Sequence, residues 1–144
     1  MQQFIGWILR ILQNYGPSLL YGAGRTIIIA IVGTLIGCVI GFIIGIIQTI
    51  PVGKGDNIVK RIVLKVVKAL LYCYVEVFRG TPMMVQAMFI YYGTAMVFGI
   101  IMSMWFSAFF IVSINTGAYM AETVRGGILS IDDGQTEGAK AIGM

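Results

Sequence analysis

The stretch TIIIAIVGTLIGCVIGFIIGII, residues 26–47, decides what kind of protein this is. It holds no charged residue, and as a helix it would be about 33 Å long, enough to cross a bilayer core of roughly 30 Å. Glycine recurs in it at every fourth position and would form one smooth ridge along the helix. The ridge residues are Gly33, Gly37, Gly41 and Gly45. Such a ridge lets another helix approach closely, and we expect packing inside one bundle rather than a dedicated dimer face.

The composition of the whole chain also indicates a membrane environment. Of its 144 residues, 58% are hydrophobic and only 11% are charged, whereas roughly 25% of the residues of a soluble domain are charged. Because so few polar groups cannot cover a surface that faces water, we predict an all-α integral membrane protein that crosses the cell membrane several times. The net charge of +4 does not indicate nucleic-acid binding, because the basic residues cluster in one loop whose ordinary role is membrane orientation.

The groups that most enzymes use are missing from the sequence. It contains no histidine, and its cysteines, Cys38 and Cys73, lie in separate apolar segments without the spacing of metal ligands. The pair Gly53–Lys54 has neither the upstream glycine nor the following hydroxyl residue of a phosphate-binding loop. We therefore expect no catalytic activity, no metal and no cofactor, so that energy for any transport comes from another subunit or from an ion gradient.

The basic residues predict how the chain is oriented. The loop at residues 51–68 carries five of them against one acid, whereas the other flank of residues 26–47 has only Arg10 and Arg25. The charged residues of the loop are Lys54, Asp56, Lys60, Arg61, Lys65 and Lys68. Because loops rich in lysine and arginine stay in the cytoplasm, we predict three transmembrane helices with the N-terminus outside and the C-terminus inside.

The apolar runs predict where the segments lie. The crossings are expected at about residues 26–48, 69–93 and 99–121. Residues 1–21 hold too short an apolar run to span and suit a separate helix at the membrane interface, whereas residues 22–144 form one membrane domain. The sequence YYGT at residues 91–94, with two aromatic anchors and a glycine, should end the second crossing.

Two opposite charges, Glu76 and Arg79, lie within the second expected crossing. They are three residues apart, so on a helix they share a face and can pair. Since a charge at the membrane centre is costly, two arrangements are compatible with the sequence. Either the two face the bundle interior, as pathway groups or an ion pair, or the helix lies shallow and the crossing starts near Gly80. We favour a long, tilted helix kinked near Pro82.

Polar residues further along are also candidates for a pathway. Asn115 lies within the third expected crossing and Glu122 at its end. Arg125 follows Glu122 at the spacing of a helical ion pair, so Glu122 is equally compatible with a structural pair.

The charged stretch at residues 122–144 is expected in the cytoplasm. Asp132 or Asp133 should cap a short helix that begins near Gly134, with the acid Glu137 complementing the positive helix end. Small residues follow and would give this helix a smooth face. The pattern is compatible with an ordinary solvated helix and with a helix that inserts into a groove on a partner.

Three groups of residues resemble, in the same order, motifs of the permeases of binding-protein-dependent ABC importers. The sequence EGAKAIG at residues 137–143 is similar to the EAA motif of that family, E-A-A-x-x-x-G, with Gly138 in place of the first alanine. The sequences FRGTP at residues 78–82 and NTGAYMAETVRGGI at residues 115–128 are similar to the branch that imports polar amino acids. The resemblance covers about residues 22–144.

The resemblance implies a type I permease subunit. A second permease subunit, identical or paralogous, would then complete the pathway, and an extracytoplasmic solute-binding protein would deliver the polar amino acid. Two cytoplasmic ATPase subunits, which bind the ATP, would dock on the helix that couples them to transport. By this resemblance the coupling residues are Glu137, Gly138, Ala139 and Gly143.

Two further expectations concern completeness and an alternative function. The family's motif continues past its glycine towards two more crossings, whereas this sequence stops at Met144, so we expect a fragment of the bundle that does not transport alone. The alternative is a small helical membrane protein for assembly or regulation, without a transport path, that binds partners through the ridge from Gly33 to Gly45.

Overall fold

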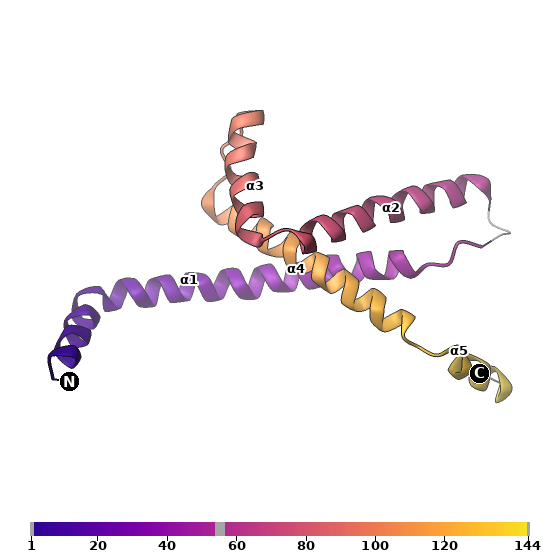
Figure 1. Cartoon of the computed structure of the whole chain (residues 1–144), viewed down its shortest axis with the longest axis horizontal. Coiled ribbons are helices and arrows are strands. Elements are labelled where there is room, and N and C mark those ends of the chain that lie inside the picture. The colour runs from indigo at the N-terminus through magenta and orange to yellow at the C-terminus, as the bar shows by residue number, and fades with distance from the viewer. Residues whose placement is uncertain (1, 54–56, 144) are drawn as a thin grey trace.

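The computed structural model describes residues 2–53 and 57–143, and its regular structure is helical, which confirms the expected all-α architecture. The helices are α1 (Gln2–Thr49), α2 (Ile58–Gly80), α3 (Met83–Phe98), α4 (Met104–Leu129) and α5 (Asp133–Ala141). Figure 1 shows α4 crossing the long α1, α2 returning towards that crossing, and α3 pointing away from α1. Lys54 and Asp56 of the basic loop, and Met144, lie outside the described residues.

The first helix corrects the expectation of a separate interfacial helix at residues 1–21. α1 runs unbroken from Gln2 to Thr49, with Pro17 inside it. Because proline has no backbone N–H, the carbonyl of Gln13 loses the donor that a regular helix would supply. Figure 1 shows α1 bent near its N-terminal end, as a proline within a helix produces.

The glycine ridge of α1 is buried against α4. The facing pairs are Gly33 with Val112, Gly37 with Thr116, Gly41 with Met120, and Gly45 with Val124. The residue numbers rise together along the two helices, so the chain runs in the same direction in α1 and α4. The contact is closest at Gly41, where an added β-carbon would collide with the Gly117 carbonyl oxygen and lie 2.9 Å from the Ala121 nitrogen. The two backbones therefore touch there.

The second expected crossing, residues 69–93, is divided between two helices rather than formed by one kinked helix. α2 ends at Gly80 and α3 begins at Met83, with Thr81 and Pro82 extended between them. A proline drives the residue before it into the extended conformation, so the helix stops instead of bending. The helix α3 continues past residues 91–94 to Phe98 and ends at Gly99, whose φ of 67° is left-handed. Where the crossing itself ends stays a prediction.

The fourth helix is displaced towards the C-terminus relative to the expected crossing at residues 99–121. It begins at Met104 because the Ser103 side chain accepts a hydrogen bond from the Phe106 N–H at 3.2 Å and so caps the helix. It continues to Leu129. Glu122 and Arg125 therefore belong to this long helix and not to a separate segment that starts at residue 122.

The described residues include two helical stretches that are long and apolar enough to cross a membrane, Gln3–Thr49 and Met104–Leu129, and a shorter apolar helix, Met83–Phe98. Buried apolar residues are few within this part of the chain, whereas many large apolar side chains of α1 and α3 are exposed. So large an exposed apolar surface fits a lipid environment and not water. The number of crossings and their orientation stay predictions.

Candidate functional site

The break between α2 and α3 is held by one buried side chain, Gln86. Pro82 has no N–H, so the carbonyl of Phe78 lacks the donor that a continuous helix would supply. The Gln86 Nε2 donates to this carbonyl oxygen at 2.9 Å and also contacts the carbonyl and hydroxyl oxygens of Thr81 at 2.9 and 2.8 Å. Because Gln86 is only 8% exposed, the protein itself satisfies the polar end of the interrupted helix.

The helix α4 joins this network through Asn115. The Asn115 Nδ2 donates to the Gln86 Oε1 at 3.0 Å and lies 3.4 Å from the Phe78 carbonyl oxygen. Earlier in α2, the Tyr74 hydroxyl donates to the Ile114 carbonyl oxygen of α4 at 2.6 Å. The structure therefore places Asn115, a candidate pathway group, in a hydrogen-bond network that joins α2, α3 and α4.

Replacing Gln86 by leucine should loosen this junction. The leucine leaves the Phe78 carbonyl and the Asn115 amide short of partners, and an unsatisfied buried group costs about 1–3 kcal/mol. We expect the purified chain in detergent to lose its monodisperse form at a lower temperature than the wild type. The control Gln3→Leu removes an exposed amide from α1 and should leave this temperature unchanged. Equal shifts in both variants would contradict the role of Gln86.

Three charged side chains of α2 and α4 meet at one place. The Arg125 Nη1 donates to the Glu122 Oε1 at 3.2 Å, and the Arg79 Nη1 lies 3.8 Å from the Glu122 Oε2. The Arg79 guanidinium also lies 5.8 Å from the ring centre of Tyr119. These charged side chains are 32% to 39% exposed. Two cations and one anion leave one unit of positive charge in a partly exposed cluster.

This cluster corrects the expected pairing of Arg79 with Glu76. The acidic partner of Arg79 is Glu122 on α4, because the C-terminal end of α2 packs against α4. Glu76 is exposed on α2. The helical pair of Glu122 and Arg125 is present, and Glu122 serves both arginines.

The helix α5 forms where the sequence predicts it, and its two ends have clear physical causes. The Asp132 carboxylate accepts a hydrogen bond from the Gly134 N–H at 2.7 Å and caps the start. Gly143 follows the end with a φ of 83°, and its N–H donates to the Lys140 carbonyl oxygen at 3.2 Å. Glycine takes this left-handed conformation without strain, so Gly143 is a helix stop.

The residues assigned to the coupling contact lie on an open surface of α5. Glu137, Gly138 and Gly143 are exposed, and Ala139 is partly exposed. Figure 1 shows α5 beyond the end of α4, apart from the other helices. An added β-carbon at Gly138 would meet no neighbouring heavy atom within 4 Å. The small-residue face of α5 is therefore accessible to a partner.

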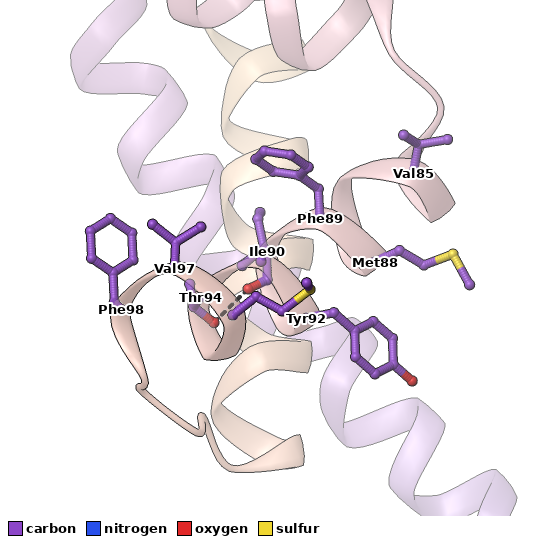
Figure 2. Close-up of a pocket in the computed structure, with 10 residues that line it drawn as sticks. Val85, Met88, Phe89, Ile90, Tyr92, Thr94, Val97 and Phe98 are labelled. Carbon is purple, nitrogen blue, oxygen red and sulfur yellow. Dashed lines mark hydrogen bonds between the residues drawn. The ribbon is translucent and has the colours of Figure 1, made fainter.

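The helix α3 carries an apolar hollow of about 740 Å³, shown in Figure 2. Thr94 donates its hydroxyl hydrogen back to the Ile90 carbonyl oxygen at 2.7 Å, so its polar atom is satisfied within the helix. The lining residues are Val85, Met88, Phe89, Ile90, Tyr92, Gly93, Thr94, Met96, Val97 and Phe98. This surface suits lipid chains or another apolar helix rather than a polar solute. Among the described residues, no group of three or more His, Cys, Asp or Glu side chains is placed to hold a metal ion.

A family comparison identifies the chain. The family model described as "Binding-protein-dependent transport system inner membrane component" matches residues 58–144, more than half of the sequence. The chain belongs to this family. The resemblance of its motifs to the permeases of this family is confirmed. The family is one of transporters and not of enzymes.

Individual relatives match about half of this chain. It is 40% identical over 89 residues to the nopaline transport system permease protein NocM of Agrobacterium fabrum, covering 56% of this chain and 37% of NocM. It is 41% identical over 71 residues to the arginine transport system permease protein ArtQ of Bacillus subtilis, covering 49% of this chain and 32% of ArtQ. The matched part thus spans about a third of the length of these relatives.

A solved structure matches nearly the whole chain. A chain in the crystal structure of an amino acid ABC transporter with histidines is 32% identical in sequence to this chain, with a TM-score of 0.74. The match covers 92% of this chain and 56% of the other. The chain therefore shares the helix arrangement of part of that transporter.

Sequence reasoning assigned no role to Gln86 or Tyr74, which the structure places at the helix junctions. For Gln86 a signal was present, because a glutamine four residues after Pro82 can fold back to the carbonyl that the proline leaves without a donor. For Tyr74 no local signal exists, since its acceptor, the Ile114 carbonyl oxygen, is 40 residues away in sequence.

Proposed function

We propose that this chain forms the membrane-spanning permease part of an ABC importer of polar amino acids. The observation that carries the proposal is the fold match over 92% of the chain, at 32% identity, to a chain of an amino acid ABC transporter. The names of the relatives agree with it, since they include nopaline, arginine and glutamine transport system permeases.

In this proposal the cluster of Arg79, Glu122 and Arg125 meets the solute. An amino acid carries a carboxylate and an ammonium group, and the cluster offers guanidinium groups and a carboxylate as complements. The Arg79–Glu122 separation of 3.8 Å is longer than the about 2.7–2.9 Å of a tight charge-assisted hydrogen bond. A solute carboxylate can therefore reach Arg79 without first breaking a close pair. Glu76 and Asn115 are further candidate pathway groups, Glu76 being exposed and Asn115 acting through the network around Gln86.

The energy for import would come from partner subunits. The exposed face of α5, with Glu137, Ala139 and the helix stop at Gly143, would dock in a groove on a cytoplasmic ATPase subunit. ATP would be bound there and not by this chain. A second permease subunit, identical or related, would complete the pathway, and an extracytoplasmic solute-binding protein would deliver the amino acid.

The alternative function, a membrane protein for assembly or regulation without a transport path, is less well supported. It would bind partners through the glycine ridge of α1. That ridge is occupied by α4 of the same chain, so it is not an open binding surface.

Photo-crosslinking tests the proposed class of partner. A photoreactive amino acid in place of Glu137 should, on illumination of intact cells, join the chain to an ABC ATPase subunit that mass spectrometry identifies in the adduct. The same probe in place of Gln13, exposed on α1, should give no ATPase adduct. If position 137 yields no ATPase while the chain is present in the membrane, the alternative function is favoured.

A further inference from the structure

A second cavity lies where the C-terminal end of α1 meets α2 and α4. Its volume is about 380 Å³, and its lining residues are Gln48, Lys68, Ala69, Tyr72 and Arg125. Only Arg125 is shared with the charge cluster of the proposed pathway. The proposed transport function assigns no role to this cavity.

The lining of the cavity is positively charged. Lys68 and Arg125 contribute one positive charge each, and no acidic residue is among the lining residues. The Lys68 Nζ donates to the neutral carbonyl oxygen of Ile50, which uses one of its three donors and does not neutralise its charge. Arg125 shares the single carboxylate of Glu122 with Arg79. The cavity therefore favours an anion.

The side-chain amide of Gln48 independently indicates a ligand site. Both polar atoms of its amide, Nε2 and Oε1, are buried without a hydrogen-bond partner among the described residues. Such a group costs about 1–3 kcal/mol, and native proteins rarely keep one without a reason. Because Gln48 lines the cavity, a rotation of its side chain would turn the amide N–H groups towards an anion beside Lys68.

The surroundings fit an amphiphile better than a small soluble anion. Large apolar side chains near the cavity in sequence are exposed, including Ile46 on α1 at 40% and Leu70 on α2 at 66%. Tyr72, at 52% exposed, combines an aromatic ring with a hydroxyl, as side chains at a membrane interface do. Basic cavities between membrane helices bind anionic headgroups.

We propose that this cavity binds the phosphate group of an anionic phospholipid, with Lys68, Arg125 and Gln48 as donors. The lipid chains would then lie along the apolar surfaces of α1 and α2. A bound headgroup would satisfy the Gln48 amide and hold the end of α1 against α2 and α4.

Native mass spectrometry of the full chain in detergent tests this proposal. With equal amounts of phosphatidylglycerol and phosphatidylcholine, the wild type should retain more phosphatidylglycerol, and Lys68→Gln should lower this preference about fivefold. The control Lys65→Gln removes the same charge from the preceding turn of α2 and should leave the preference unchanged. Equal retention of both lipids by the wild type, or equal losses in the two variants, would overturn the proposal.

Gln48→Leu separates headgroup binding from a structural role. It removes the amide donors without changing the charge, so the amount of phosphatidylglycerol retained should fall. Thermal stability in phosphatidylcholine and detergent should not fall, because the unsatisfied amide is removed. Inorganic phosphate is tested alone as the other source of a phosphate group. If it binds with the same dependence on Lys68 while neither lipid is preferred, the occupant is a soluble anion and the lipid proposal is wrong.

Discussion

Replacing Gly41 by leucine should abolish the packing of α1 on α4. A β-carbon at this position would collide with the Gly117 carbonyl oxygen and lie 2.5 Å from the Met120 Cβ. Because the collision begins at the β-carbon, no rotamer of the new side chain avoids it, and the backbones must separate. Overpacking a close contact costs about 1–3 kcal/mol even for small additions. We expect Gly41→Ala to lower the thermal stability of the purified chain and Gly41→Leu to prevent its recovery as a monodisperse species.

The same helix offers a matched control for this prediction. An added β-carbon at Gly24 would meet no neighbouring heavy atom within 4 Å, so Gly24→Leu should behave as the wild type. Both changes add the same apolar side chain to α1, and of the two positions only Gly41 faces α4. If Gly41→Leu were as stable as Gly24→Leu, the close parallel contact between the helices would be refuted.

Reversing the charge at Glu137 should uncouple ATP hydrolysis from uptake. Glu137 is exposed on α5, so Glu137→Lys should leave folding and membrane insertion intact while placing the wrong charge in the proposed ATPase contact. A mismatched charge at an interface costs several kcal/mol, so uptake should fall about tenfold or more. The measurement is uptake of a labelled amino acid per amount of the chain in the membrane, with ATPase activity followed in parallel.

Two other variants show whether this effect belongs to α5. Gly143→Val places a branched residue at a φ of 83°, where only glycine is unstrained, and should also reduce uptake by disturbing the end of the helix. Gln13→Lys adds a positive charge to the exposed side of α1 and should have no effect. Wild-type uptake in both Glu137→Lys and Gly143→Val would rule out α5 as the coupling element.

Features set by local sequence could be predicted well. The uncharged run at residues 26–47 lies within α1, and its glycine spacing already indicated a surface for close helix contact. The cap of α5 followed from an aspartate before a short polar helix, and the structure has Asp132 in that position. These features depend on neighbours within a few residues, which the sequence displays directly.

Features set by distant contacts could not be predicted. The sequence predicts Glu76, three residues away, as the partner of Arg79, whereas the structure pairs Arg79 with Glu122 on α4. The sequence predicts a kink at Pro82, whereas the helix is fully interrupted there. The interruption is possible because the Gln86 and Asn115 amides meet the Phe78 carbonyl oxygen, which the sequence does not show. Helix ends also differ from the expected bounds where a single cap, such as Ser103, decides the boundary.

Uptake of labelled polar amino acids by cells that carry or lack the gene for this chain tests most directly whether it is part of an amino acid importer. Deletion should abolish the ATP-dependent uptake of at least one polar amino acid, and the wild-type gene should restore it. The gene with Gly41→Leu should not, because its membrane helices no longer pack. Unchanged uptake of every polar amino acid after deletion would contradict the proposed function.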